Sequence, residues 1–384
     1  MSLEALLAAK EIAVCCGPGG VGKTTVAAAS AAMAATGSGA KVLVITVDPA
    51  RRLADALGLA GLGNAEMQVD LAGFPGRPVR GRGHGQLWAA MLDTRRAWDD
   101  LVRRHAPDAG TARRILDNAL YQDIAERFVQ SHDYIAMERL YEIHSAGTYD
   151  LIVVDTPPSR HAVDLLEAPS RLGEFLSSRW LRWLTAPARS SLLQLASRPF
   201  TQVADRILGA QFLADIADFF LLLQGMYEGF AARAGAVERL LRDRRTTFLV
   251  VSTLEASAAR EADFLLGALA ERGLHAGALV CNKVLPATLC DPVVSETAAR
   301  LQAEAEAAAA ALGEPAVARV LGEVGTSFAN FAVVAQREAE TRAEMAHRPE
   351  VVVEVAHFDR DIADLDGLSR LGRALWARPG AAQP

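Results

Sequence analysis

The segment that most constrains this chain is a glycine-rich loop near its N-terminus, GPGGVGKT, at residues 17–24. An apolar run, Ile12 to Cys16, comes directly before the loop and predicts a buried parallel strand. An alanine-rich stretch over residues 24–36 follows and predicts a helix that ends at Gly37. A strand, a glycine-rich turn and a helix N-terminus in this order can surround an anion with backbone N–H groups. The loop therefore predicts a phosphate-binding site.

The spacing of this loop, G-x-x-x-x-G-K-[ST], is the Walker A arrangement of nucleotide-binding proteins. We expect Lys23 to reach the β- and γ-phosphates of ATP and the Thr24 hydroxyl to bind a magnesium ion. The alternative is an accidental glycine-rich turn, which the strand and helix on either side disfavour. The predicted nucleotide contacts here are Gly17, Gly19, Gly20, Val21, Gly22, Lys23, Thr24 and Thr25.

Apolar runs alternate with helical stretches along the chain, which predicts an α/β fold with three layers and a mainly parallel sheet. The other predicted strands cover residues 41–47, 86–92, 151–155, 247–252, 278–282 and 351–355. Ligands of such sheets bind at the carboxyl ends of the strands. Asp48, Asp155 and Asn282 each lie at or just past such an end. We therefore expect them to lie near the glycine-rich loop.

Three polar residues at strand ends are candidates for roles in nucleotide chemistry. Asp48, in the segment TVDPARRLADAL, could hold the water that attacks the γ-phosphate, or simply form an Asp-Pro turn. Asp155 ends an all-apolar strand, as a Walker B acid does, and we expect it to hold magnesium through water. Asn282, followed by Lys283, could contact the adenine edge with its donor and acceptor, or serve as a turn residue.

The domain organisation predicted from these patterns is one α/β domain interrupted by a helical insertion. Residues 1–168 and 244–377 form its two parts, residues 169–243 form the insertion, and residues 378–384 form a disordered tail. Apolar side chains recur at helical spacing in the insertion, and they either pack its core or line a groove for a hydrophobic partner. The candidates for such a groove are Trp180, Trp183, Phe219, Phe220, Leu222, Leu223 and Met226.

Composition excludes several classes of protein. The net charge of −6 gives no reason to expect a nucleic-acid partner. The four cysteines contain no C-x-x-C pair, so neither a zinc site nor a disulfide framework is expected. The N-terminus lacks the layout of a signal peptide, and a reducing cytoplasm is the expected location.

At this point the sequence resembles a known family. The segments GPGGVGKTT, VDPARRLADALG, VVDTPPSRHAVDLL and CNK are similar to the ArsA family of arsenical-pump and tail-anchored-protein-targeting ATPases, in the SIMIBI class of dimeric P-loop ATPases. The similarity runs from about Ile12 to Leu371 and is greatest to a bacterial, actinobacterial branch. It implies ATP hydrolysis with magnesium, Asp48 as the group that activates water, residues 155–161 as a switch segment, and Asn282 with a loop within residues 356–360 near the base.

Two departures from the family pattern qualify this expectation. Family members carry a lysine at the second loop position that reaches the partner's phosphates, and Pro18 stands there in this chain. Arg51 or Arg52 could replace that lysine, a paralogous subunit could supply it, or hydrolysis could be slow or absent. Only Cys290 lies near the position of the zinc-binding pair of the targeting factors, so no zinc is predicted. The arsenite-binding cysteines have no match, which disfavours arsenite pumping.

The predicted function is a dimeric ATPase, homomeric or paired with a paralogue, whose helical insertion binds a hydrophobic client helix or membrane protein. One alternative is a slow or non-hydrolysing subunit that binds partners in response to nucleotide. A second is a positioning ATPase similar to MinD and ParA, which would use a C-terminal amphipathic helix on a membrane. Packing against the domain is the other explanation of that helix, whose apolar stripe comprises Leu365, Leu368, Leu371, Leu375 and Trp376.

Overall fold

The computed structural model describes residues 1–47, 52–71, 74, 85–92, 94–118, 121–122, 129–157, 227–362 and 364–377. The chain divides into two compact units. Unit 1 comprises Met1–Ala90, Tyr149–Ser159 and Arg244–Pro384, and unit 2 comprises Met91–Thr148 and Arg160–Asp243. The predicted helical insertion lies outside the described residues except for 227–243, and the predicted tail lies outside them entirely.

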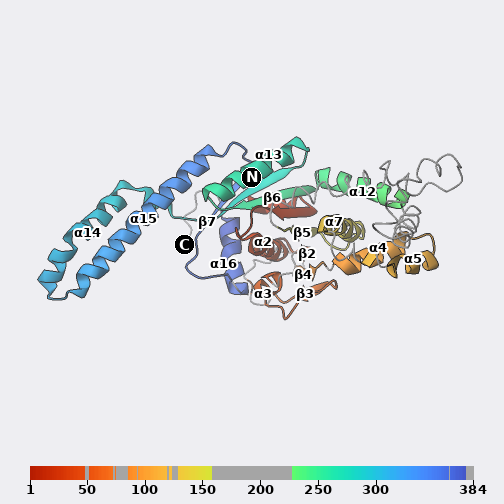
Figure 1. The fold of residues 1–384 in the computed structure, drawn as a ribbon, viewed down its shortest axis with the longest axis horizontal. Coiled ribbons are helices and arrows are strands. Elements are labelled where there is room, and N and C mark those ends of the chain that lie inside the picture. Colours follow the sequence, from red (N-terminus) through yellow and green to blue (C-terminus); the bar gives the residue numbers. More distant parts are fainter. Residues whose placement is uncertain are drawn as a thin grey trace, which may run out of the picture. The chain divides into compact units, whose positions relative to one another are not determined.

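Unit 1 is built on an eight-stranded sheet with the order β3-β4-β2-β5-β1-β6-β7-β8 (Figure 1). Strand β1 pairs in parallel with β5 and β6, and the pairs β2–β5, β6–β7 and β7–β8 are also parallel. The predicted α/β class with a mainly parallel sheet is therefore confirmed. The strands are β1 (Ile12–Cys16), β2 (Lys41–Thr46), β3 (Met67–Val69), β4 (Gln86–Met91), β5 (Leu151–Asp155), β6 (Thr246–Ser252), β7 (Ala276–Val284) and β8 (Val351–Ala356).

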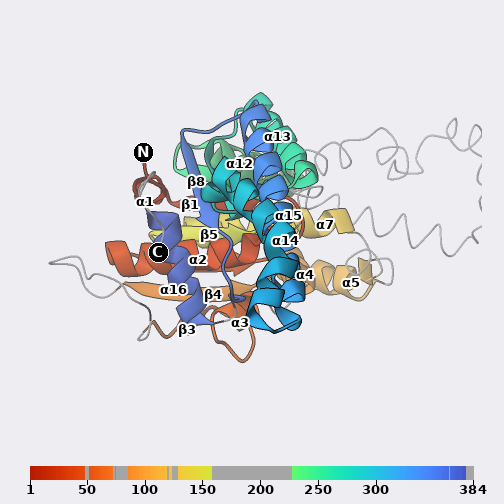
Figure 2. The same ribbon diagram turned by 90° about the vertical axis from the view of Figure 1, so that its left-hand side faces the viewer.

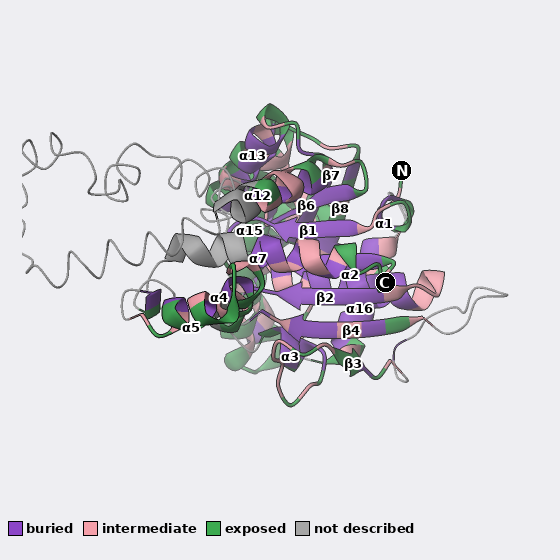
Figure 3. Ribbon diagram, turned by 90° about the vertical axis from the view of Figure 1, so that its right-hand side faces the viewer, coloured by how far each residue is buried: buried purple, intermediate pink, exposed green. Residues whose placement is uncertain are grey.

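Strand β3 was not predicted, because its three residues are too few to establish an alternating pattern. It runs antiparallel to β4 at one edge of the sheet. The central strands β1, β5 and β6 are buried along their whole length (Figure 3). Strands buried on both faces are continuous apolar runs, which is why the sequence revealed them so clearly.

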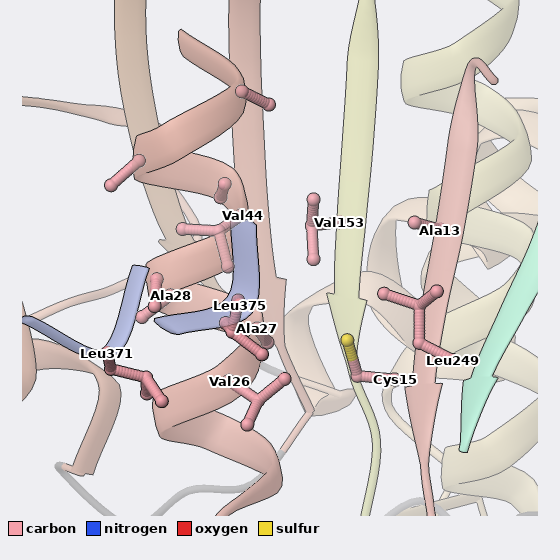
Figure 4. Close-up of a cluster of buried hydrophobic side chains, with 14 of the residues drawn as sticks. Ala13, Cys15, Val26, Ala27, Ala28, Val44, Val153, Leu249, Leu371 and Leu375 are labelled. Atoms are coloured by element: carbon pink, nitrogen blue, oxygen red, sulfur yellow. The ribbon is translucent and has the colours of Figure 1, made fainter. Parts of the chain in front are cut away.

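Helices cover the sheet of unit 1, and α2 lies at the centre of its core. The helices of this unit are α1 (Leu3–Ala8), α2 (Lys23–Ser38), α3 (Arg52–Ala56), α13 (Ala256–Glu271), the short η1 (Ala287–Cys290), α14 (Pro292–Leu312), α15 (Ala316–Glu344) and α16 (Leu365–Trp376). The small side chains of α2 allow it to approach the sheet closely. Figure 4 shows Ala27 and Ala28 of this helix near Val44 of β2.

The C-terminal helix α16 packs within unit 1 along its apolar stripe. Leu368, Leu371 and Leu375 are fully buried, and α16 contacts α1, α2 and β8 (Figures 2 and 4). A side chain at Gly372 would meet the Met33 side chain at 2.5 Å, which shows how closely α16 and α2 approach. Packing therefore explains the amphipathic pattern that a membrane-binding helix would also have produced.

Helices α14 and α15 form a long hairpin in unit 1. Helix α14 begins after the Asp291 cap and ends at the left-handed Gly313. Helix α15 was not predicted at all, although it has 29 residues. Its glycines, β-branched residues and aromatic residues weaken local helix propensity, and its partner α14 is what makes it helical.

The described part of unit 2 consists of helices α4 (Thr94–His105), α5 (Ala109–Leu116), α7 (Val129–Ser145) and α12 (Tyr227–Arg242). Helices α7 and α12 are joined by a partly buried ion pair, in which Arg233 donates to the buried Glu138 at 2.7 Å. Burial raises the pKa of the Glu138 carboxyl, and the Arg233 guanidinium opposes that rise. Arg233 also stacks on the Tyr141 ring at 4.4 Å, so a single arginine links these two helices in two ways.

Candidate functional site

The predicted phosphate-binding loop lies between β1 and α2, as its sequence indicated. Gly17 has a φ of 144°, and a Cβ atom there would lie 2.0 Å from the carbonyl oxygen of Val251 in β6. Only glycine can therefore occupy this position, because any side chain would collide with the neighbouring strand. The first residue of the loop therefore packs directly on strand β6 of the sheet.

The loop ends at Gly22, which precedes the first residue of α2. Gly22 has a φ of 92° and provides no side-chain cap for the helix. A Cβ atom at Gly22 would lie 2.5 Å from the Asn282 side-chain nitrogen. The first turn of α2 also carries no acidic residue, so its N–H groups and positive dipole end have no competing carboxylate. This helix N-terminus is suited to an anion.

Lys23 is the first residue of α2 and is buried, with 7% of its surface exposed. Its ammonium group donates to the backbone oxygen of Pro18 at 2.6 Å. A buried ammonium group at the start of a helix is well placed to bind an anionic phosphate. Pro18, which replaces the lysine expected from the family pattern, is itself buried within the chain.

Asp155 is the last residue of β5, and it lies beside the C-terminal end of β1, which leads into the loop. The register pairs Cys15 with Asp155 on one side and Thr46 with Asp155 on the other. The Thr46 hydroxyl donates to the Asp155 Oδ2 atom at 2.9 Å, and both side chains are buried. Thr46 was not among the predicted site residues, although a polar residue that ends an apolar strand was an available signal. It fixes the orientation of the Asp155 carboxylate.

Asn282 and Lys283 interrupt the pairing of β7 with β8. The register shifts between Cys281 and Val284, and Lys283 has a φ of 60°, the only positive value outside glycine among the described residues. Such a bulge changes the direction of the side chains beside it. The Asn282 amide donates to the backbone oxygen of Val21 at 2.8 Å. Asn282 thus supports the phosphate-binding loop, a role that sequence reasoning missed, and its contact with adenine remains a prediction.

The segment after β8, predicted to lie near the base, follows the same edge of the sheet. The His357 N–H donates to the Val284 carbonyl at 2.9 Å, directly beyond the bulge at Lys283. The Phe358 ring lies 5.9 Å from the Arg370 guanidinium of α16. Residues 356–360 and Lys283 therefore lie at the same end of the neighbouring strands β8 and β7, which is compatible with the predicted base contact.

Three of the four thiols are buried near this corner or behind it. Burial, together with the neighbouring Asp155 carboxylate, raises the pKa of the Cys15 thiol. Burial likewise raises the pKa of Cys16 to about 12 and that of Cys281 to about 12. These groups remain protonated at neutral pH, so they behave as small apolar side chains and not as nucleophiles or thiolate ligands.

Several predicted residues lie outside the described part of the chain. They include Asp48 and Arg51, the second part of the predicted switch at residues 158–161, and every candidate groove residue from Trp180 to Met226. Arg52 begins α3 and is exposed. The structure therefore brings together the loop, Thr46, Asp155 and Asn282.

Comparison with known proteins agrees with this geometry. A family model described as "Anion-transporting ATPase" and named for ArsA matches residues 10–310. The chain belongs to the ArsA ATPase family. An uncharacterized protein of Streptomyces coelicolor is 33% identical over 273 residues, which cover 70% of this chain and 61% of that protein. The alignment therefore spans less than two thirds of this relative's own length.

Two further relatives of this ArsA-family chain carry functional names. The ATPase GET3 of Malassezia globosa is 25% identical over 281 residues, which cover 72% of this chain and 74% of that protein. A putative arsenical pump-driving ATPase of Halobacterium salinarum is 30% identical over 180 residues, which cover 45% of this chain and 26% of that protein. These functional names belong to those proteins, and what this chain shares with them is sequence similarity over the ranges given.

ArsA-family ATPases use ATP with magnesium, and the side chains at this corner fit that ion. The Thr24 hydroxyl and the Asp155 carboxylate are hard oxygen donors, the type of ligand that magnesium prefers. Thr46 holds one oxygen of Asp155 in place from the adjacent strand. Magnesium is usually bound through one or two protein ligands together with phosphates and water, so these donors suffice.

Proposed function

We propose that this ArsA-family chain hydrolyses ATP at the corner where β1, α2 and β5 meet. The observation that supports the proposal most is the combination of an uncapped helix N-terminus, the buried Lys23 and a carboxylate fixed at the end of the adjacent strand. The helix N-terminus and Lys23 are positive and the carboxylate is negative, so they match the phosphates of ATP and its magnesium ion respectively. The helix N-terminus and the lysine attract phosphate, and the carboxylate is a hard oxygen ligand of the type that magnesium prefers.

Each residue has a distinct role in the proposed reaction. The loop amides cradle the phosphates, and Lys23 exchanges the Pro18 carbonyl for the β- and γ-phosphate oxygens. Thr24 and Asp155 hold magnesium, which neutralises charge on the phosphates when it is bound. Asp48 orients the water that attacks the γ-phosphate, the role that the family resemblance implies for it. Asn282 maintains the loop through the Val21 carbonyl.

The proposal extends to a dimer whose nucleotide state is coupled to unit 2. Two copies, or this chain and a paralogue, close around ATP, and the helical unit then exposes or covers a surface for a hydrophobic client. The names of the relatives support this only at the level of the family. Pro18 cannot supply a cation to a partner's phosphates, because proline has neither charge nor N–H. This favours a heterodimer in which the paralogue provides the lysine.

Calorimetry and turnover measurements test the nucleotide site. We expect wild type to bind magnesium-ATP, and Lys23→Ala to lose turnover by about 100-fold or more, as when a single transition-state donor is removed. Asp48→Asn should keep ATP binding and lose turnover. Lys10→Ala is the matched control, because the Lys10 ammonium group donates to the Arg244 carbonyl at the other end of β1 and its loss should change neither. Absence of ATP binding by the folded wild-type chain would contradict the proposal.

Pro18 also motivates the second candidate function, a slow or non-hydrolysing subunit. If wild type and Asp48→Asn turn over ATP equally, at the background rate, this candidate is favoured. Pro18→Lys then decides the cause. Restored turnover in the lone chain would show that the missing cation limits the rate, whereas an unchanged rate would assign the loss to another part of the site.

A further inference from the structure

The hairpin of α14 and α15 is held together by small side chains. The buried residues along its seam are Ala298, Ala305, Ala309, Gly325, Ala332 and Ala335. A Cβ atom at Gly325 would lie 2.8 Å from the Ala298 carbonyl oxygen, so the two backbones approach closely. The Gln302 amide also donates to the Thr326 hydroxyl across the hairpin at 3.1 Å. The pairing of these helices therefore leaves the large apolar residues of α15 unused.

Those large residues form a second stripe on α15, exposed to solvent. We call it the α15 stripe: Val320, Val324, Phe328, Phe331 and Val334, each with 38% to 52% of its surface exposed. The members are four, four, three and three residues apart, so they share one helix face, and Val320, Val324, Phe331 and Val334 occupy the seam positions of a coiled-coil heptad. Scattered exposed apolar residues need no explanation, but a continuous stripe on one helix face marks a contact surface.

The stripe is presented on a fixed arm. Near the C-terminal end of α15, the Glu338 carboxylate accepts a hydrogen bond from the Leu285 N–H at 2.9 Å. Arg342 of the same helix pairs with Glu354 of β8 at 3.0 Å, and α15 also contacts α13 and η1. Beyond these contacts the two helices run side by side, away from the sheet of unit 1 (Figure 1). The arm holds its apolar face away from the core that could otherwise bury it.

We propose that the α15 stripe is covered by the α15 stripe of a second copy of this chain, with the two helices antiparallel. When the stripe is written as a heptad repeat, Val324 and Phe331 share one seam position, and Val320 and Val334 share the other. Antiparallel pairing places these two positions opposite each other. Val324 then lies opposite Val334 of the second copy, and the Phe328 side chains of both copies meet near the two-fold axis.

The charges beside the stripe are arranged for this pairing. Glu323 and Arg337 are two heptads apart, so they occupy the same flank of the stripe, with Asn330 midway between them. An antiparallel two-fold axis through the middle of the helix brings Glu323 opposite Arg337 of the second copy, twice, and pairs Asn330 with itself. Parallel pairing would instead place Glu323 beside Phe328. Glu323 is available for this contact, because its internal pair with Arg319 is 3.7 Å long and well exposed.

This association is separate from the nucleotide-driven dimer proposed above. No member of the stripe belongs to the nucleotide site, and the contact requires neither ATP nor magnesium. The full chain should therefore self-associate in the absence of nucleotide. A chain that fails to bind ATP would leave the prediction for the hairpin unchanged, so the two proposals can fail independently.

Sedimentation velocity of the full, nucleotide-free chain over micromolar concentrations tests the contact. We expect reversible dimers, and we expect Phe328→Glu and Phe331→Glu to weaken them by at least about thirtyfold, since both residues are central and apolar. Val333→Glu is the matched control, because Val333 is 51% exposed on the same helix but lies off the stripe. A monomeric wild-type chain, or equal weakening by the control, would overturn the proposal.

Charge exchange tests the antiparallel register. Glu323→Arg and Arg337→Glu should each weaken the dimer by about two- to fivefold, and the double variant should recover wild-type affinity. Failure of the double variant to recover would contradict this register.

Helix α15 is also long and apolar enough to cross a membrane by length and composition alone. Wild type is therefore mixed with vesicles of zwitterionic and anionic phospholipid, and a monomer that binds them through the stripe would overturn the proposal in favour of a lipid surface.

Discussion

Two alanine-rich helices of unit 1 have opposite environments. The alanines of α2 at positions 27, 28, 29, 31, 32 and 35 are completely buried, because the sheet lies on one side of the helix and α16 on the other. Of the many alanines of α14, only Ala298, Ala305 and Ala309 are buried, because α15 is almost its only neighbour. Alanine content thus predicts a helix in both places and predicts burial in neither.

The difference separates a region built for a fixed geometry from one built for contact. Around α2, Lys23, Thr46 and Asp155 are all buried, so these side chains have little freedom to move. On the hairpin, the large side chains face solvent and contribute little to the stability of the monomer. Substitutions in the two regions should therefore have different consequences.

The largest expected contrast is between two phenylalanines. Phe248 of β6 is 1% exposed, and Phe248→Ala should lower the free energy of unfolding by about 3–5 kcal/mol, through lost transfer energy and a cavity. Phe328 of the hairpin is 46% exposed, and Phe328→Ala should change it by no more than about 0.5 kcal/mol. Urea unfolding of dilute protein measures both. Equal losses would show that the hairpin is as much part of the core as the sheet.

A smaller contrast concerns hydrogen bonds in the two regions. Asn282→Ala removes the donor to the buried Val21 carbonyl and should cost about 1–3 kcal/mol, seen as lower stability and weaker ATP binding. Gln302→Ala removes an exposed hydrogen bond within the hairpin and should leave ATP binding unchanged. Calorimetric titration with magnesium-ATP compares them. If Asn282→Ala binds ATP normally, the bond to Val21 does not maintain the loop.

Threonine hydroxyls provide a finer comparison. Thr46→Val removes the bond that orients Asp155 and should raise the magnesium concentration for half-maximal turnover roughly tenfold, the usual effect of losing a ligand's supporting partner. Thr46→Ser should retain the wild-type value. Thr326→Val on the hairpin loses the bond to the Gly322 carbonyl and the bond from the Gln302 amide, and it serves as the control. An unchanged magnesium dependence in Thr46→Val would exclude the orienting role.

Thiol reactivity gives the smallest effect, because it reports access without changing the fold. The raised pKa values of Cys16 and Cys281, about 12 in both cases, leave only about one molecule in ten thousand as thiolate at pH 8. Cys290 lies in η1 at the base of the hairpin and is partly exposed. A disulfide reagent should therefore modify one thiol rapidly in the native chain and the other three only on unfolding. Rapid modification of a second thiol would indicate that the core around α2 opens.

Sequence reasoning located most of the sheet and much of the site, but it missed the contacts between distant segments. Asp155 and Asn282 were recognisable because each is a polar residue at the end of an apolar run. Their partners were not, since Thr46 is 109 residues from Asp155 and Val21 is 261 residues from Asn282. Those contacts depend on the order of the strands in the sheet, which a list of strands does not specify. The roles of Asp48 and of residues 158–161 remain predictions.

The sequence by itself determined the strand, glycine-rich loop and helix that receive phosphate, because backbone conformation and helix dipole there depend on neighbours in the chain. It likewise determined the parallel character of the sheet through its apolar runs. Only the tertiary structure decided that α16 is buried while the large residues of α15 are exposed, although both helices carry apolar stripes. Burial is a property of the surface that a helix meets, and that surface comes from parts of the chain far away in sequence.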